Sequence, residues 1–428
     1  MHLEGVQFMI KNDFYEHARE KYAEIGIDTD AALKTLRATP VSMHCWQGDD
    51  VGGFEHEGSA LGGGNGIQVT GNYPGKARTL AELREDIEKV FTLVPGANRL
   101  NLHASYADFS ETGFADRDSL EPKHFASWID WSKRNNIPLD FNSTFFSHPK
   151  AGGMTLSSKD KGIRDFWIEH AKRCREIGAA FGKEQGSACI HNIWIADGMK
   201  DIPADRNGYR KILESSLDEI LSVKHPADFI KDCVESKVFG IGTESYVVGS
   251  HEFYMGYATS RNLMLTLDMG HFHPTENVAD KISSMLMFVP EIMFHLSRGV
   301  RWDSDHVTIL NDDMRQIGEE VVRTGKLDKI HLGTDFFDGS INRIGAWAIG
   351  TRATKKALLF GLLQNNKKLV EYEEDGNYFA RLAMNELYKT LPFGDVWEHF
   401  CISEGVPTDA QLINAVADYE KNVTSKRA

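Results

Sequence analysis

Three short stretches of the chain combine carboxylates and imidazoles at a spacing that suits metal chemistry. They are residues 267–273 (LDMGHFH), His295 and residues 302–306 (WDSDH). Together they place three Asp and four His within 40 residues. Carboxylate oxygens and imidazole nitrogens are ligands of divalent ions such as Mn²⁺, Co²⁺ or Zn²⁺. Glu235 upstream and Asp335 downstream bring the donors to a number sufficient for two ions.

Each of these residues has an ordinary explanation when it is taken alone. A single Asp after a strand usually caps a helix, and a single His in an apolar run is more often a core residue. The clustering favours a metal site. Asp268 and His271 are separated by a flexible glycine, so both can reach a cation above a strand end. Asp303 and Asp305 would share one side of an extended segment, where two carboxylates repel unless a cation or a proton lies between them.

Other side chains near the same segments could contact a substrate. Lys237 follows Glu235 by two residues and would share its side, as a salt-bridge partner, a ligand of a substrate oxygen or a proton donor. Aromatic side chains that could cover a sugar and exclude water are also present. They are Trp46, Phe146, Trp194 and Trp302.

Short apolar runs alternate with longer segments of helical periodicity. The runs are 41–44, 100–103, 139–142, 190–195, 229–235, 264–268, 292–296 and 329–335. Helical segments include 80–93, 125–135, 163–181, 210–221, 279–287 and 309–323. This alternation predicts parallel strands with crossover helices, and eight such units close a (β/α)₈ TIM barrel. An open doubly wound sheet is the second choice, but no Gly-rich turn follows the first run.

Polar residues stand at or near the carboxyl ends of these runs. They are His44, His103, Asn142, Asp197, Glu235, Asp268, His295 and Asp335. Because the active sites of such barrels lie at that face, we expect these side chains to converge on one axis.

Helical patterns precede and follow the barrel. Residues 8–37 predict amphipathic helices before the core, and 344–363, 378–391, 396–403 and 409–425 predict helices after it. We therefore divide the chain into a catalytic barrel with its helical lead-in (1–345) and a last barrel helix with a C-terminal extension (346–428) that forms oligomer contacts. The Gly-rich residues 62–66 lack the ending of a phosphate-binding loop and predict a mobile loop over the barrel mouth.

Composition excludes several classes of function. The net charge of −14 disfavours binding to nucleic acid or anionic lipid. Five scattered cysteines indicate neither a disulfide framework nor a thiolate zinc site, and a cytoplasmic location fits them best. The chain starts without a signal-peptide pattern, and no apolar run approaches the 18 residues of a membrane span.

The residues alone leave three reaction classes open. His271 and His273 form the HxH pattern of metal-dependent barrel hydrolases, although that pair usually belongs to the first strand. A barrel endonuclease is disfavoured by the charge. Metal-assisted aldose–ketose isomerisation needs divalent ions with oxygen and nitrogen ligands, and the aromatic residues would suit a sugar. A binding protein built on a decayed barrel would be expected to have lost some ligands.

The chain closely resembles the bacterial L-rhamnose isomerase family along nearly its whole length. The segments that carry the resemblance are 41–50 (VSMHCWQGDD), 70–77 (TGNYPGKA), 99–103 (RLNLH), 192–195 (NIWI), 197–201 (DGMKD), 253–260 (FYMGYATS), 270–276 (GHFHPTE) and 301–306 (RWDSDH). The residues before Phe14 and after Gly405 match the family less clearly.

The resemblance implies a homotetrameric (β/α)₈ enzyme that interconverts L-rhamnose and L-rhamnulose with two divalent ions per subunit, Mn²⁺ or else Zn²⁺ or Co²⁺. The structural ion would be held by Glu235, Asp268, His295 and Asp335. The catalytic ion would be held by His271, Asp303 and Asp305.

The expected mechanism is a metal-mediated 1,2-hydride shift, with an enediol route as the competing possibility. Asp335, Lys237 and Asp303 would act in catalysis, with Asp335 as the acid or base of ring opening. Substrate contacts would come from His103, Trp46, Trp194, Phe146 and Lys237.

Overall fold

The computed structural model describes residues 2–55 and 69–427, with side chains from residue 13 onward. The Gly-rich residues 62–66 lie outside the described residues. Within the described ranges, no helix is both long enough and apolar enough to cross a membrane.

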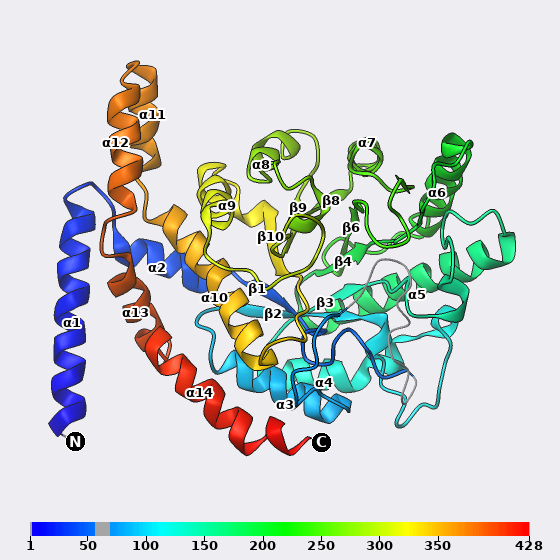
Figure 1. Cartoon of the computed structure of the whole chain (residues 1–428), viewed down its shortest axis with the longest axis horizontal. Coiled ribbons are helices and arrows are strands. Elements are labelled where there is room, and N and C mark those ends of the chain that lie inside the picture. Colours follow the sequence, from blue (N-terminus) through cyan, green and yellow to red (C-terminus); the bar gives the residue numbers. More distant parts are fainter. Residues whose placement is uncertain (1, 56–68, 428) are drawn as a thin grey trace.

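Eight parallel strands form a closed barrel (Figure 1). They are β1 (Val41–His44), β2 (Asn98–His103), β3 (Leu139–Asn142), β4 (Cys189–Ile193), β6 (Ile230–Glu235), β8 (Met264–Asp268), β9 (Ile292–Leu296) and β10 (Ile330–Thr334). Their order around the barrel follows the chain, and β10 closes it by pairing with β1. Each predicted apolar run overlaps one of these strands, so the predicted (β/α)₈ barrel is confirmed. A separate two-stranded sheet pairs β5 (Gly198–Met199) with β7 (Tyr246–Val247).

One helix follows each barrel strand. These helices are α3 (Leu80–Phe91), α4 (Ala126–Asn135), α5 (Lys161–Gln185), α6 (Arg206–Ile220), α7 (His251–Arg261), α8 (Asp280–Met285), α9 (Asp312–Arg323) and α10 (Arg343–Leu362). Several begin at residues whose side-chain oxygens accept backbone N–H groups of the first turn, namely Thr79, Asp160, Asp205, Asn311 and Asn342.

The remaining helices lie together on one side of the barrel (Figure 1). They are α1 (His2–Ala23), α2 (Thr29–Ala38), α11 (Asn366–Glu374), α12 (Tyr378–Tyr388), α13 (Phe393–Ser403) and α14 (Asp409–Asn422). The ring of Tyr15 in α1 stacks on that of His399 in α13, with centroids 3.6 Å apart. The N-terminal lead-in and the C-terminal extension therefore form one helical layer. The domain boundary after residue 345 falls inside α10, and that division stays a prediction.

Candidate active site

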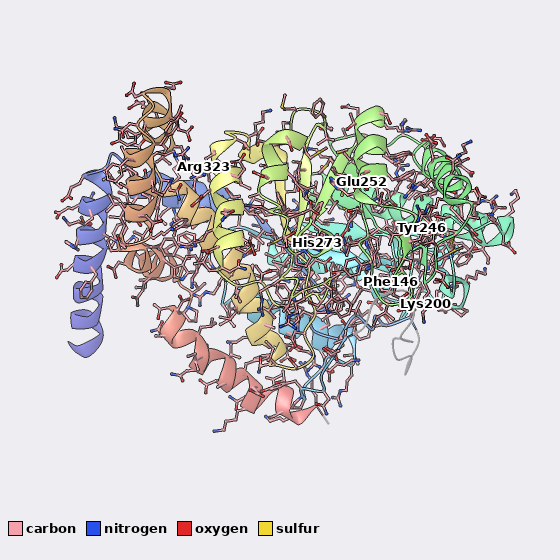
Figure 2. All side chains as sticks on the ribbon, turned by 45° about the horizontal axis from the view of Figure 1, so that its top comes forward. Phe146, Lys200, Tyr246, Glu252, His273 and Arg323 are labelled. Atoms are coloured by element: carbon pink, nitrogen blue, oxygen red, sulfur yellow. The ribbon has the colours of Figure 1, made fainter. Side chains whose placement is uncertain are left out.

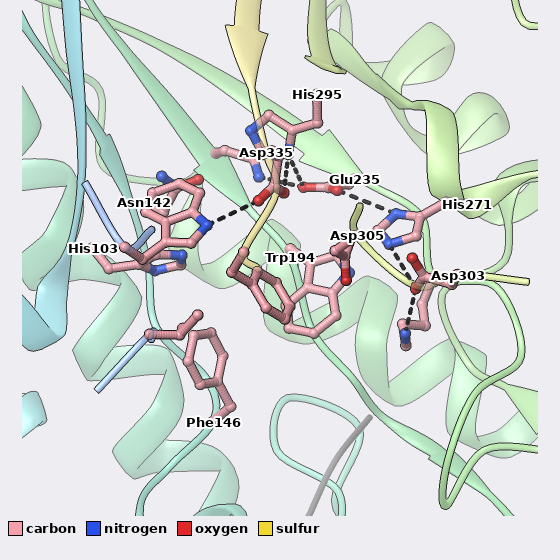
Figure 3. A pocket seen from close by; sticks show the side chains of 15 residues that line it. His103, Asn142, Phe146, Trp194, Glu235, His271, His295, Asp303, Asp305 and Asp335 are labelled. Carbon is pink, nitrogen blue, oxygen red and sulfur yellow. Dashed lines mark hydrogen bonds and ion pairs between the residues drawn. The ribbon is translucent and has the colours of Figure 1, made fainter. Parts of the chain in front are cut away.

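The carboxyl ends of the barrel strands surround a pocket of about 500 Å³. Its lining comprises Trp46, Val51, His103, Asn142, Phe146, Asn192, Trp194, Glu235, Lys237, His271, His295, Asp303, Asp305, Asp335 and Phe337. Figure 3 shows ten of these side chains labelled in the pocket. The residues expected as metal ligands, catalytic groups and substrate contacts all appear in this lining except Asp268, which is buried beside it. The structure thus brings together side chains that lie almost 300 positions apart in the chain.

Four of the expected ligands form one tight cluster. Glu235, Asp268, His295 and Asp335 each offer a ligand atom, and these atoms lie within 4.8 Å of one another. His295 Nδ1 is 3.1 Å from Glu235 Oε2, 3.1 Å from Asp335 Oδ2 and 3.8 Å from Asp268 Oδ2. These four residues end β6, end β8, lie in β9 and follow β10, so the barrel itself sets their spacing. The cluster could hold a divalent metal ion.

Several buried polar atoms of this region have no hydrogen-bond partner. They are Asp268 Oδ2, His271 Nδ1, both ring nitrogens of His295, and Asp303 Oδ1. A buried polar atom without a partner costs folding free energy. All of these atoms are carboxylate oxygens or imidazole nitrogens, which are ligands of divalent ions. The set therefore fits such an ion, and binding of the ion would take the place of the missing hydrogen bonds.

A second group of charged residues adjoins the cluster. His271 Nδ1 is 3.2 Å from Glu235 Oε1, and its Nε2 is 3.3 Å from Asp303 Oδ2. Lys237 Nζ donates to Asp303 Oδ2 at 3.0 Å, so one of the three roles expected of this lysine, the salt bridge, is present. Within the described residues no second set of ligands is as tightly grouped as the first. A catalytic ion on His271, Asp303 and Asp305 therefore stays a prediction.

The electrostatics of the first cluster reflect crowded carboxylates. Burial alone would raise the pKa of Glu235, but the imidazoles of His295 and His271 outweigh burial and hold that pKa well below its usual range. Burial raises the pKa of Asp268 far above its usual range, and the charges of Glu235 and Asp335 raise it further. This protein environment thus favours the ionised form of one carboxyl and the protonated form of its neighbour.

The second group shows the same division between its two carboxyls. Burial would raise the pKa of Asp303, but Lys237 and His271 outweigh it and hold that pKa far below the usual value. Burial and the charge of Asp303 raise the pKa of Asp305 well above the usual value. Two nearby carboxyls that cannot both ionise easily are a recognised feature of metal and acid–base sites.

The loops around the pocket differ from the sequence pattern at Gly270 and at the segment that carries Asp303 and Asp305. At Gly270 a Cβ would lie 2.6 Å from Asp303 Oδ1, so the glycine allows a close approach of the two loops, a role that the sequence pattern did not indicate. Asp303 and Asp305 do not lie on an extended segment, because the backbone turns through positive φ angles at Arg301 (69°) and Asp305 (42°). The two carboxylates reach one pocket through this turn and not through strand alternation.

Aromatic rings form a wall of the pocket beside the carboxylates and imidazoles. Trp46 and Phe146 pack against the ring of His103, at centroid distances of 4.6 and 5.3 Å. Trp194 stacks with the ring of His271 at 6.3 Å. Trp302 does not line this pocket; it is 43% exposed and lines a neighbouring cavity. Three of the four expected aromatic residues therefore form a pocket wall.

The HxH pattern does not form a metal-binding pair. His271 faces the pocket, whereas His273 is exposed, bonds to Thr275 and lines the neighbouring cavity. His273 and the pocket residue Phe146 are both labelled in Figure 2, and they line different cavities. The geometry of a barrel hydrolase that depends on this pair is absent.

Not every polar residue at a strand end reaches the pocket. Asp197 instead accepts hydrogen bonds from Thr155 and Ser157, and His44 bonds to Thr334. Sequence reasoning also missed three lining residues, Val51, Asn192 and Phe337. Asn192 carried a usable signal, because it is an amide inside an apolar strand; its side chain donates to Glu235 Oε2 at 2.5 Å.

The cluster predicts that a bound metal ion stabilises the folded protein and that this stabilisation depends on Glu235. We expect Mn²⁺ to raise the Tm of the EDTA-treated parent protein, because an ion that binds only the folded state contributes about 2.7 kcal/mol at a concentration of 100 Kd. In a Glu235→Gln variant this rise should be largely lost. Calorimetry of both proteins with and without Mn²⁺ measures it. An equal rise in the two proteins would contradict an ion on Glu235.

Comparisons with known proteins give one consistent result. A family model described as L-rhamnose isomerase (RhaA) matches residues 9–427. The L-rhamnose isomerase of Bacteroides thetaiotaomicron is 55% identical over 413 residues, which cover 96% of this chain and 98% of the relative. That of Rhodopirellula baltica is 53% identical, with 97% and 96% covered. That of Salmonella agona is 54% identical, with 97% and 98% covered.

Proposed function

The chain belongs to the L-rhamnose isomerase family and is an aldose–ketose isomerase, and from this premise we propose that it interconverts L-rhamnose and L-rhamnulose with two divalent ions. The observation that carries the proposal is a single pocket in which a carboxylate–imidazole cluster adjoins an aromatic wall. The cluster suits a metal ion, and the wall suits the face of a sugar.

We assign the two ions to adjoining ligand sets. The structural ion belongs to Glu235, Asp268, His295 and Asp335, whose ligand atoms are already grouped. The catalytic ion belongs to His271, Asp303 and Asp305, and His271 adjoins both sets. Mn²⁺ is our first choice, and Zn²⁺ or Co²⁺ would satisfy the same donors.

The proposed reaction moves one hydride and one proton. In the open-chain sugar the hydride passes from C2 to C1 while the O2 proton passes to O1, so that the aldehyde becomes an alcohol and C2 becomes the ketone. Bound divalent ions supply Lewis-acid polarisation of the sugar oxygens in this step.

The side chains of the pocket bind and orient the sugar. Asp335, whose Oδ1 accepts the Trp46 indole N–H at 3.0 Å, exchanges a proton at the anomeric hydroxyl or the ring oxygen as the ring opens. Lys237 and His103 orient hydroxyl groups. Trp46, Trp194 and Phe146 cover the sugar and exclude water from the transferred hydride.

Deuterium at C2 of the substrate tests the hydride shift. We expect L-[2-²H]rhamnose to give L-rhamnulose that carries the label at C1, because the hydride moves directly between neighbouring carbons. Mass spectrometry and NMR of the product measure the retained label. Exchange of most of the label into water during turnover would indicate an enediol and contradict the hydride shift.

We also propose that the chain assembles as a homotetramer through its helical layer. The α11–α12 pair carries exposed apolar side chains that a subunit interface would cover. They are Val370, Tyr378, Phe379, Leu382 and Leu387, of which Phe379 is 80% exposed. Sedimentation of the intact chain would report the assembly. The cytoplasm is the proposed location, supported by five cysteines that are all free thiols.

Related aldoses should also react at this site. A methyl-sized difference at C6 is worth only about 1–3 kcal/mol in a binding pocket. Sugars that share the C2 and C3 stereochemistry of L-rhamnose are therefore expected as slower substrates.

A further inference from the structure

A buried hydroxyl group lies directly behind the pocket residue His103. Thr144 Oγ1 is 2.9 Å from His103 Nδ1 and accepts the backbone N–H of Ala104 at 2.9 Å. Thr144 is completely buried and is not among the residues that line the pocket. It acts on the site only through the imidazole ring.

The hydrogen bonds around Thr144 determine which ring nitrogen of His103 carries the proton. A threonine hydroxyl has one hydrogen to donate and two lone pairs, and Ala104 occupies a lone pair. Among the described residues the hydroxyl hydrogen has no acceptor besides His103 Nδ1. Burial lowers the pKa of His103 to about 3, so the ring is neutral in the physiological pH range. The ring proton then resides on Nε2.

Thr144 is itself held from both sides of its backbone. Its N–H donates to His170 Nε2 at 3.0 Å, and its carbonyl accepts Arg117 Nη1 at 2.6 Å. His170 Nδ1 in turn donates to the Arg117 carbonyl at 3.0 Å. Arg117 and His170 are both buried, and the Arg117 guanidinium also donates to the Phe146 carbonyl at 2.8 Å. One buried network therefore fixes the aromatic wall and the hydroxyl behind His103.

We propose that Thr144 is a positioning residue that presents His103 to the sugar as an Nε2–H donor. This inference rests on the proposed function, which places a sugar against His103. The imidazole lies between Trp46 and Phe146 and its Nδ1 is occupied, so Nε2 is the atom left to meet the substrate. A ring oxygen or a carbonyl oxygen can only accept a hydrogen bond, so it needs this tautomer and would be left unpaired by the other.

Neutron diffraction of the deuterated, Mn²⁺-loaded enzyme shows the tautomer directly. We expect deuterium on His103 Nε2 and on Thr144 Oγ1, with none on His103 Nδ1. Deuterium on Nδ1 of the parent enzyme would overturn the proposal, and this readout requires neither a variant nor an activity.

Two substitutions of Thr144 then separate the effect of its hydroxyl group from the effect of its side-chain volume. Thr144→Ser keeps the hydroxyl and should leave kcat/KM within about threefold of the parent, whereas Thr144→Val, of nearly equal volume, should lower it about 10- to 100-fold. Thr354→Val is the matched control, because its buried hydroxyl bonds only within α10, to Gly350. It should not change kcat/KM.

The tautomer of His103 in the Thr144→Val variant distinguishes the ways in which the proposal can fail. Nε2 protonation together with parental kcat/KM in Thr144→Val would overturn the proposal, because the hydroxyl would then be dispensable. Transfer of the proton to Nδ1 with unchanged kcat/KM would also overturn it, since His103 would not donate to the sugar. In both cases a metal-dependent parent activity on L-rhamnose would leave the proposed function in place.

Discussion

Replacing Asp303 and Asp305 together by asparagine should abolish turnover and leave a folded protein. Both side chains reach the pocket, and Asp303 contacts both His271 and Lys237. Neutral amides bind divalent ions far more weakly than carboxylates, and a catalytic ion contributes several kcal/mol of charge stabilisation. We therefore expect kcat to fall at least about 1,000-fold. Ketose formation under saturating Mn²⁺ measures the effect.

The double variant should remain folded, although it loses the buried ion pair of Asp303 with Lys237. Removing one partner of such a pair costs about 3–5 kcal/mol, and relief of the crowding between Asp303 and Asp305 offsets part of that cost. In the EDTA-treated state its Tm should lie below that of the parent, and circular dichroism should still show a cooperative unfolding transition. Asp312→Asn with Asp313→Asn makes the same change of charge at the start of α9, outside the pocket, and should keep the parental rate. A rate near normal in Asp303→Asn with Asp305→Asn would show that the catalytic ion was assigned to the wrong residues.

Replacing Lys237 by methionine should lower kcat by about 100- to 10,000-fold, the usual contribution of a positioned proton donor or acceptor. The ammonium group is buried and lies 3.0 Å from Asp303 Oδ2. Burial alone would lower the pKa of Lys237, but Asp303 outweighs burial and raises it, so the side chain stays charged. Methionine has a similar length and no charge. Steady-state kinetics with L-rhamnose measures the loss.

Lys231→Met is the matched control for this variant. Lys231 lies on the same strand, β6, and also pairs with a carboxylate, Glu291, at 2.8 Å. That pair lies near the amino end of the strand, away from the pocket, so its loss should leave kcat unchanged. If the two lysine variants lost activity equally, the effect would arise from stability and not from the site.

The barrel could be predicted from the sequence because its signals are local. Each strand is a short buried apolar run, and all five residues of β9 are buried. Two helices escaped prediction, α7 and α11. In α7 the exposed Met255 and the partly buried Phe253 interrupt the polar face, so the helical period is weak. The predicted start of one helix agreed with the structure at a capping residue, because α3 begins at Leu80 directly after Thr79.

The metal ligands could be placed from the sequence for a related reason. Their side chains follow or occupy barrel strands, and the closed barrel has one face at which such residues meet. The details that depend on contacts between loops could not be placed. Two examples are the turn at Asp305 and the hydrogen bond from Thr144 to His103. Neither produces a periodic pattern in the sequence from which it could be predicted. Trp302 illustrates the limit, because it was expected to cover a sugar and instead is exposed and lines a neighbouring cavity.

The most direct test of the account is isomerisation of L-rhamnose by the EDTA-treated protein, with and without added Mn²⁺. The account predicts no ketose from the treated protein and restored formation of L-rhamnulose when Mn²⁺ is added, because the ligand set around His295 and His271 would then be filled. Full activity of the metal-free protein, or no ketose with Mn²⁺, Co²⁺ or Zn²⁺, would contradict it.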